Sequence, residues 1–314
     1  MTKKLLICLN VDSLLPEYYE QFEKAGDLDI TFVRAKDVKA EDVKGKHIIV
    51  GNVPPAMLKD ADSLELMQLN SAGFDNYLGF VPKNAHLCTS VGAFSPAVGE
   101  HMLAMTFSLI RHFHQYRDKQ NNKDWSDLGK IISVEGSTIA VLGLGDIGRS
   151  YAKKVKALGA KTVIGVRRNV NNKPEYIDEM YALTDLKKAI EKADIVCNVL
   201  PSSKETIGLF NENTFNMMKD GAYFINVGRG DAVNQDDLLK ALRSGKLAGA
   251  ASDVFVPEPL PKDSPLWDEP KLLITPHVAG WFFLKETLDR IIRISSSNVR
   301  AFLEGKDLVN DEEH

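Results

Sequence analysis

The stretch Thr138-Ile-Ala-Val-Leu-Gly-Leu-Gly-Asp-Ile-Gly148 decides the fold of this 314-residue chain. An apolar run leads into the spacing Gly-x-Gly-x-x-Gly, and the periodicity of an amphipathic helix follows. In that order the first glycine permits a tight turn and the second lets the backbone approach a pyrophosphate. The third lets helix and strand pack closely, while free N–H groups at the helix start can hold the anion. We therefore predict a dinucleotide-binding site made by Gly143, Gly145, Asp146, Ile147 and Gly148. In the expected helix Ile147, Tyr151, Val155 and Leu158 fall on one face, and Gly159 is expected to cap its C-terminus.

The segment after this helix indicates which dinucleotide binds. Sites for NAD normally place an acid at the end of the second strand, where it binds the ribose 2′-hydroxyl. Here that position is Val166, followed by Arg167 and Arg168. Two guanidinium groups can bind a 2′-phosphate, which a carboxylate would repel. The sequence therefore favours NADP(H) over NAD(H), although paired arginines could also be a solvated strand end.

Composition excludes several classes of protein. Hydrophobic residues make up 44% and charged residues 26%, and the net charge is −4, so nothing draws the chain to nucleic acid or to an anionic membrane. The apolar helical run 102–110 is too short to span a bilayer. Cys8, Cys88 and Cys197 are isolated, which is typical of reduced, buried thiols in a cytoplasmic protein. His112 and His114 lack a nearby acid or cysteine cluster, so no metal site is predicted.

The first third of the chain alternates strand and helix patterns. A helix is expected at 16–25, and strands are expected at 5–9, 30–34, 47–51 and 87–89. The segment 64–69 is expected to be a further strand or a short helix–strand junction. This alternation favours a parallel sheet with helices on its faces. Ser95 and Pro96 then open a helix reaching to about residue 115, which is apolar nearly all round and so is expected to be buried at a domain junction or between subunits.

From Thr138 the alternation restarts as a separate domain. Six strands are expected, at 139–142, 162–166, 195–199, 223–227, 249–252 and 272–275. The final helix, at about 284–303, is expected to return to the first lobe. The predicted fold class is α/β with two doubly wound parallel-sheet domains: a Rossmann dinucleotide-binding domain (96–285) inserted in a flavodoxin-like substrate-binding domain (1–95 and 286–314).

Three polar motifs follow strand ends in the second domain. They are Asn226-Val-Gly-Arg-Gly230, Asp253-Val-Phe-Val-Pro-Glu-Pro259 and Thr275-Pro-His-Val-Ala-Gly280. Open α/β sheets bind ligands at the carboxyl ends of their strands, so these motifs occupy functional positions. Together they supply a guanidinium, a carboxylate and an imidazole, which suffice to clamp and protonate a 2-oxo acid. Each residue taken alone could be an ordinary loop residue.

With the glycine fingerprint before them, these motifs resemble those of the D-isomer-specific 2-hydroxyacid dehydrogenase family, over nearly the whole chain. The resemblance implies that Arg229 binds the substrate, that His277 is the acid/base, and that Glu258 hydrogen-bonds this histidine. It also implies that the backbone amides of a first-domain loop hold the substrate carboxylate, at Ser71, Ala72 and Gly73. Further cofactor contacts are implied at Leu200, Pro201, Thr206, Val227, Gly228, Asp253 and Gly280.

The chemistry of these groups agrees with the resemblance. When a hydride reaches a keto carbon, the developing alkoxide must take a proton, and a carboxylate partner favours the protonated form of His277. The planar fork of Arg229 can bind a carboxylate and a keto oxygen together. Glu258 argues against the related formate dehydrogenases, in which a glutamine is expected at this position.

Two further stretches resemble the glyoxylate/hydroxypyruvate reductase branch: Val166-Arg-Arg168 and Glu258-Pro-Leu-Pro-Lys-Asp-Ser-Pro-Leu-Trp267. We expect NADPH-dependent reduction of a small 2-oxo acid to a D-2-hydroxy acid, by a homodimer as the family implies. Little chain follows the last helix, so we expect no regulatory C-terminal domain.

Two alternatives remain open. A phosphoglycerate dehydrogenase-like enzyme would need basic residues near the loop at 70–76, and Lys83 is the first. A nucleotide-sensing binding protein, like the corepressors of this fold, would bind NADPH without turnover. The cluster Trp281-Phe282-Phe283 could cap an apolar substrate side chain or simply pack.

Overall fold

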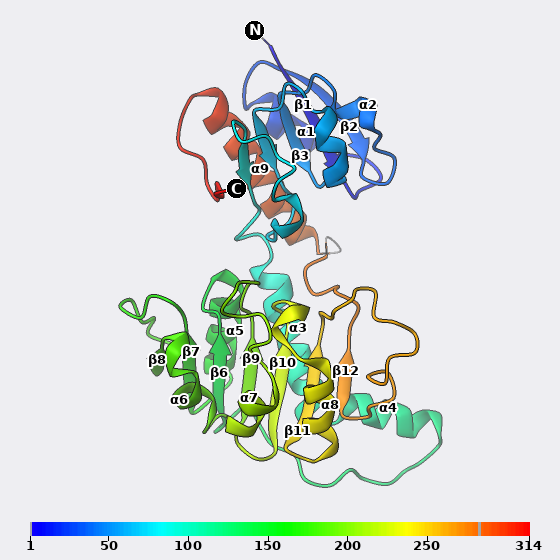
Figure 1. Ribbon diagram of the computed structural model, residues 1–314, viewed down its shortest axis with the longest axis vertical. Coiled ribbons are helices and arrows are strands. Elements are labelled where there is room, and N and C mark those ends of the chain that lie inside the picture. The colour runs from blue at the N-terminus through cyan, green and yellow to red at the C-terminus, as the bar shows by residue number, and fades with distance from the viewer. Residues whose placement is uncertain (1, 282–283) are drawn as a thin grey trace. The chain divides into compact units, whose positions relative to one another are not determined.

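The computed structural model describes residues 2–281 and 284–314 (Figure 1). They form two compact units, one from the residues up to 94 together with those from 281 onward, and one from residues 95–280. The predicted boundaries, after residues 95 and 285, differ from this division by one and five residues. The limits of the functional domains stay a prediction.

The first unit is built on a five-stranded parallel sheet in the order β2-β1-β3-β4-β5. This is the flavodoxin-like order, which confirms the predicted fold class. Its strands are β1 (Lys3–Leu9), β2 (Leu28–Arg34), β3 (Ile48–Gly51), β4 (Leu66–Gln68) and β5 (His86–Cys88). Its helices are α1 (Pro16–Glu23), α2 (Ala40–Val43), α9 (Lys285–Leu303) and the short 3₁₀ turns η1 (Pro55–Asp60) and η2 (Asp75–Tyr77).

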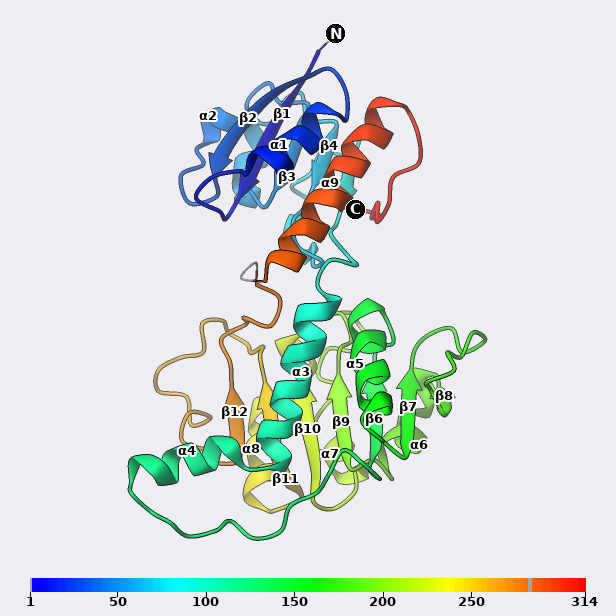
Figure 2. The ribbon, with the colours of Figure 1, turned by 180° about the vertical axis from the view of Figure 1, so that it is seen from behind.

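Alternation along β1 divides the core of this unit between two faces. Leu5, Ile7 and Leu9 pack with residues of α1 and α9, whereas Leu6 and Cys8 belong to the cluster on the other face. The predicted return of the last helix is confirmed, since α9 packs against α1 and β4. Figure 2 shows α1 and α9 side by side on this face.

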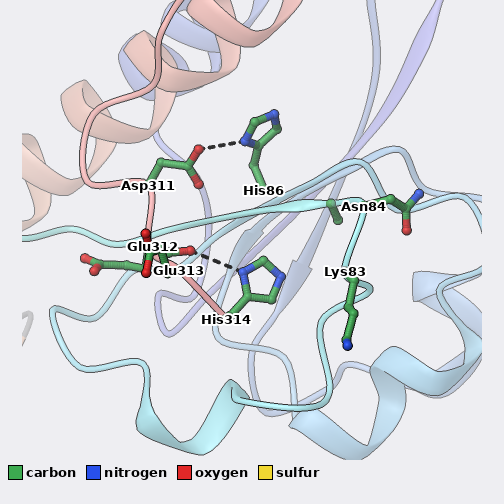
Figure 3. A pocket seen from close by; sticks show the side chains of 8 residues that line it. Lys83, Asn84, His86, Asp311, Glu312, Glu313 and His314 are labelled. Atoms are coloured by element: carbon green, nitrogen blue, oxygen red, sulfur yellow. Dashed lines mark hydrogen bonds and ion pairs between the residues drawn. The ribbon is translucent and has the colours of Figure 1, made fainter.

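A buried amide ties α9 to the sheet and to the chain end. Asn298 Nδ2 donates to Gln68 Oε1 at 2.7 Å and to the Val309 carbonyl at 2.8 Å, and its Oδ1 accepts from the Val309 N–H. Beyond this point Asp311 pairs with His86 Nδ1 at 2.7 Å (Figure 3). A surface hollow of about 260 Å³ lies there, and its lining holds no predicted site residue.

The second unit has a seven-stranded parallel sheet in the order β12-β11-β10-β9-β6-β7-β8. The prediction of six strands is wrong by one, because β8 (Glu179–Tyr181) is three half-buried residues without an apolar run. The other strands are β6 (Thr138–Leu142), β7 (Thr162–Val166), β9 (Ile195–Asn198), β10 (Ala222–Asn226), β11 (Leu247–Ser252) and β12 (Leu272–Ile274).

Helices cover both faces of this sheet (Figures 1 and 2). One face carries α3 (Ser95–Ile110) and α5 (Asp146–Ala157), and the other carries α6 (Leu186–Ile190), α7 (Glu212–Met217) and α8 (Gln235–Arg243). Short 3₁₀ turns are η3 (Leu183–Asp185) and η4 (Gly230–Ala232). Asn234 caps α8 by accepting from the Asp237 N–H. As predicted, Gly159 adopts the left-handed conformation just beyond α5. Of the residues expected on one face of α5, Tyr151 and Val155 are buried, and Leu158 at its end is 44% exposed.

The long helix predicted from residue 96 to 115 is two helices. The chain turns at His112, whose φ is +57°, and α4 (Phe113–Asn121) follows α3. In the single chain, Glu100, Ala104 and Phe107 line an exposed stripe of α3, and α4 buries no residue. The expected burial of this segment between subunits stays a prediction.

The three cysteines are reduced and buried, as predicted. Burial raises the pKa of the Cys8 thiol to about 11, and those of Cys88 and Cys197 to about 12. Among the described ranges, 2–281 and 284–314, no helix has the length and apolarity needed to cross a membrane.

Candidate active site

Three neighbouring strands of the second unit end in register, and each leads into one of the polar motifs. Asn226 of β10 pairs with Ser252 of β11, which pairs with Ile274 of β12. The residues that follow these strands therefore lie at one edge of the sheet. Arg229 comes three residues after β10, Asp253 directly after β11 and His277 three residues after β12.

The imidazole of His277 and the carboxylate of Glu258 form a hydrogen-bonded pair. His277 Nδ1 lies 2.7 Å from Glu258 Oε2, and both side chains are partly exposed. The other carboxylate oxygen, Oε1, accepts the N–H of Phe255 at 2.9 Å, which fixes the direction of the carboxylate. Because Glu258 holds Nδ1, a proton exchanged between the ring and a ligand would pass through Nε2.

The loop that carries Arg229 packs against the loop that carries Glu258. A Cβ added at Gly230 would lie 2.3 Å from the carbonyl oxygen of Phe255, so only glycine allows this approach. Phe255 in turn donates to Glu258, the partner of His277. A continuous set of contacts therefore runs from the residue beside Arg229 to the imidazole.

Two buried asparagines that the sequence analysis did not single out hold the arginine loop. Asn198 Nδ2 donates to Asn226 Oδ1 at 3.0 Å, and Asn226 Nδ2 donates to the Arg229 carbonyl at 3.1 Å. Asn226 Oδ1 also accepts from the Gly228 N–H. Both asparagines are fully buried. Each asparagine is the last residue of its strand, a position where an apolar residue is usual, and this is the sequence feature that could have revealed the pair.

Asp253 is buried to 2% exposure and accepts hydrogen bonds with both carboxylate oxygens. Oδ1 accepts from the Thr275 hydroxyl at 2.5 Å and from the Val278 N–H at 2.9 Å, and Oδ2 accepts from the Ala279 N–H at 3.0 Å. Its carbonyl accepts from the His277 N–H at 2.8 Å. Asp253 therefore shapes the histidine loop, and its implied role toward a nicotinamide stays a prediction.

The glycine fingerprint has the geometry that a dinucleotide needs. Gly143 turns with a φ of +100°, and a Cβ at Gly148 would lie 2.1 Å from the Gly143 carbonyl oxygen, so helix and strand touch there. A Cβ at Gly145 would meet no atom within 4 Å, which leaves open space above the turn. In the described part of the chain, no acceptor lies on the N–H groups of Gly145, Asp146 and Ile147. These donors are available to an anion.

The two arginines after β7 differ in their surroundings. Arg167 Nη1 is buried and, among the described residues, has no hydrogen-bond partner. Arg168 is exposed and lies 3.7 Å from Glu205 Oε2 across a surface ion pair. A buried guanidinium nitrogen without a hydrogen-bond partner destabilises the folded protein unless a ligand accepts its hydrogen bond. This observation supports an anion beside Arg167, whereas Arg168 already has a carboxylate partner.

The remaining cofactor residues implied by the resemblance build tight turns. Thr206 is buried, and its hydroxyl donates to the Pro201 carbonyl at 2.7 Å, closing the turn after β9. A Cβ at Gly228 would lie 2.6 Å from the Leu200 carbonyl oxygen, so these two turns touch. Val227 and Gly280 flank the polar motifs. Their contacts with a cofactor stay predictions.

The loop at residues 71–73 belongs to the first unit. Ser71 Oγ donates to the Gly73 carbonyl at 2.7 Å and accepts from Asn52 Nδ2, while Asn52 Oδ1 accepts the N–H of the preceding residue, Asn70. Among the residues that the structure describes, no acceptor lies on the N–H groups of Ala72 and Gly73. Side-chain hydrogen bonds thus hold the loop in place, and two backbone N–H groups can donate to a ligand. A site that binds a carboxylate needs such donors.

Of the aromatic cluster, Trp281 is described and is 43% exposed, whereas Phe282 and Phe283 lie outside the described residues. Within the described ranges, no group of three or more His, Cys, Asp or Glu side chains could hold a metal ion.

Comparison with known proteins agrees with this geometry. The family model of the D-isomer specific 2-hydroxyacid dehydrogenase NAD binding domain matches residues 103–279. Glyoxylate/hydroxypyruvate reductase A of Serratia proteamaculans is 30% identical over 277 residues, which are 85% of each chain. A D-isomer specific 2-hydroxyacid dehydrogenase family protein from Aeromonas salmonicida superposes with a TM-score of 0.86 at 33% identity, over 99% of both chains.

The chain belongs to the D-isomer-specific 2-hydroxyacid dehydrogenase family. It is therefore an NAD(P)-dependent dehydrogenase. This dehydrogenase is also similar to the NADPH-dependent glyoxylate/hydroxypyruvate reductase of Sinorhizobium meliloti, whose structure is a complex with NADP and sulfate. That likeness has a TM-score of 0.82 at 25% identity and covers 99% of this chain and 98% of the other.

Two of the three fingerprint glycines of the dehydrogenase, Gly145 and Gly148, should respond differently to a methyl group. Gly145→Ala should keep the free energy of unfolding within about 0.5 kcal/mol, since its Cβ meets nothing, yet weaken NADPH binding about tenfold or more. Gly148→Ala should lose about 1–3 kcal/mol of stability, because its Cβ collides with a carbonyl oxygen. Urea unfolding and fluorescence titration measure the two effects. Unchanged NADPH binding by Gly145→Ala would show that the fingerprint does not hold the dinucleotide.

Proposed function

We propose that this dehydrogenase reduces a small 2-oxo acid, of the glyoxylate or hydroxypyruvate type, to the D-2-hydroxy acid, with NADPH preferred. The observation that carries the proposal is the pair of His277 and Glu258, joined at 2.7 Å beside the loop that bears Arg229. The names of the similar reductases support the substrate class. The alternatives raised by the sequence have no comparable support.

In this proposal Arg229 binds the substrate. Its planar guanidinium can bridge a carboxylate oxygen and the keto oxygen of a 2-oxo acid, which orients the carbonyl and polarises it. One donor, Nη1, lies 3.0 Å from the Gly228 carbonyl, so the side chain is directed by its own loop. The amides of Ala72 and Gly73 supply further donors for the carboxylate, with Ser71 bracing their loop.

His277 supplies the proton. The bound reduced dinucleotide supplies a hydride to the keto carbon, which places negative charge on the carbonyl oxygen. A protonated imidazole at that oxygen neutralises the charge by donating from Nε2, while Glu258 accepts from Nδ1–H and orients the ring. The groups that bind and protonate the keto group then follow three aligned strand ends of one sheet.

The preference for NADPH rests on Arg167. Its buried Nη1 lacks a partner among the described residues, and it follows the strand whose end normally offers an acid to the ribose of NAD. The fingerprint amides would hold the pyrophosphate, and Arg167 would hold the 2′-phosphate, with Arg168 contributing if it exchanges Glu205 for the phosphate.

We also propose a homodimer that covers the face made by α3, α4 and the loop after α4. Phe113 is 60% exposed and Trp125 fully exposed, and α4 buries no residue. The loop is nevertheless ordered on this face, since the Leu128 N–H donates to the Tyr116 hydroxyl. Exposed aromatic side chains on a fixed surface are typical of an interface.

The cytoplasmic location stays a prediction.

Turnover tests the proposed reaction. Glyoxylate and hydroxypyruvate should be the fastest substrates in a panel of 2-oxo acids assayed with NADPH. His277→Ala should lower kcat about 100- to 10,000-fold with NADPH binding retained, because the proton donor is lost. His86→Ala is the matched control, since His86 also pairs with a carboxylate at 2.7 Å but lies in the first unit. A folded, NADPH-binding wild type that reduces no 2-oxo acid would favour the nucleotide-sensing alternative.

Cofactor preference can be assigned to one arginine. Arg167→Ala should raise KM for NADPH about 10- to 100-fold, the value of a charge-assisted hydrogen bond, and leave KM for NADH within about twofold. Arg168→Ala should have a smaller effect because it is exposed and paired with Glu205. Arg243→Ala, which removes another partly exposed, ion-paired arginine, is the control. An equal change for both cofactors in Arg167→Ala contradicts the assignment.

The dimer can be tested by light scattering. The wild type should have the mass of two chains, and the double variant Phe113→Asp/Trp125→Asp should have the mass of one, because charges cannot be buried unpaired at an apolar interface. Phe80→Asp is the matched control: this phenylalanine is 48% exposed in the first unit. A wild type that is monomeric at micromolar concentration would refute the dimer.

A further inference from the structure

A histidine on α3 reaches the loop that presents His277. His101 Nε2 lies 3.1 Å from the Thr275 hydroxyl and 3.8 Å from Asp253 Oδ1, and its side chain is 22% exposed. A histidine within an apolar helix has no sequence pattern that would predict a role for it. The contact spans 174 residues of chain.

The direction of these hydrogen bonds follows from their chemistry. An ionised carboxylate only accepts, so the Thr275 hydroxyl must donate its hydrogen to Asp253 Oδ1. The oxygen of that hydroxyl is then left to accept, and the His101 nitrogen facing it must carry a proton. His101 Nε2–H, Thr275 and Asp253 therefore form a chain of donors that ends at a buried carboxylate.

The same carboxylate organises the histidine loop. It accepts the N–H groups of Val278 and Ala279, the two residues after His277. His277 itself has a φ of +53°, a left-handed conformation that costs a non-glycine residue about 1–2 kcal/mol. The hydrogen bonds from the Val278 and Ala279 N–H groups to Asp253 hold the backbone in that conformation. They therefore set the direction in which the imidazole projects from the backbone.

The contact also joins the two segments by which the chain enters and leaves the second unit. His101 lies six residues into α3, which begins this unit, and Thr275 lies five residues before the unit ends at Gly280. Both residues belong to the second unit, and their bond fixes these segments to each other. A loosened contact would free the loop while leaving the sheet and its strand ends intact.

We infer that His101 is a positioning residue, which acts through the Thr275 hydroxyl on Asp253 and so holds the His277 loop in its reactive conformation. The inference deepens the proposed function and rests on it for the role of His277. His101 touches neither the reacting atoms nor Glu258. Its contribution is to keep the carboxylate of Asp253 in one orientation, so that the amides after His277 stay bound to it.

Amide hydrogen exchange tests the inference without relying on turnover. In His101→Ala and Thr275→Val, the amides of residues 277–279 should exchange about tenfold faster or more, whereas those of β10 and β11 should not change. Thr275→Ser keeps the hydroxyl and should exchange like the wild type. His114→Ala removes a histidine just beyond α3 that contacts the Ser108 carbonyl, and it is the matched control. Exchange at 277–279 equal to that of this control would overturn the inference.

Kinetics provide the second measurement. His101→Ala and Thr275→Val should each lower kcat about 10- to 100-fold, because a small misplacement of a catalytic group has an effect of this size. Thr275→Ser should have the kcat of the wild type. The double variant should be no slower than the slower single variant, because both remove one chain of bonds, and additive losses would contradict that chain. If His101→Ala does not fold, Thr275→Val and His101→Gln carry the test. Faster loop exchange in a protein that reduces no 2-oxo acid would support the loop contacts and refute the proposed function.

Discussion

The buried carboxylate of Asp253 is the constraint on which the site depends. An ionised carboxylate taken out of water costs several kcal/mol unless hydrogen bonds compensate it. Here the Thr275 hydroxyl and the amides of Val278 and Ala279 provide those bonds, and they come from a single loop. If the loop changed its conformation, the buried carboxylate would lose these hydrogen bonds. The free energy of the bonds therefore offsets the cost of the left-handed backbone conformation of His277.

The two units contribute different physical properties. The second unit brings three strand ends into register, so a guanidinium, a carboxylate and an imidazole follow from adjacent strands. Its rigid, buried asparagines and its close glycine contact hold the arginine and glutamate loops together, while His277 and Glu258 remain partly exposed to a ligand. The first unit has a braced loop whose described contacts leave the N–H groups of Ala72 and Gly73 without an acceptor.

The fold and the arrangement of the polar motifs at strand ends could be predicted because their signals are local. Apolar runs bounded by glycine or polar residues located nearly every strand, and the motifs that carry Arg229, Glu258 and His277 follow adjacent strands, as expected from the sequence. Three features carried no such signal. β8 is too short and polar, and the turn at His112 contains neither glycine nor proline. The contact of His101 with Thr275 depends on the packing of distant segments, which periodicity does not encode.

A crystal structure of the dehydrogenase with NADPH and oxamate, an unreactive analogue of a 2-oxo acid, tests the central claim most directly. The account predicts the Arg229 guanidinium at about 3 Å from the carboxylate of the analogue and His277 Nε2 at about 3 Å from the oxygen that replaces the keto group. The pair of His277 and Glu258 should be unchanged. An analogue bound elsewhere, or one held beside the cofactor with His277 directed away from it, would contradict the account.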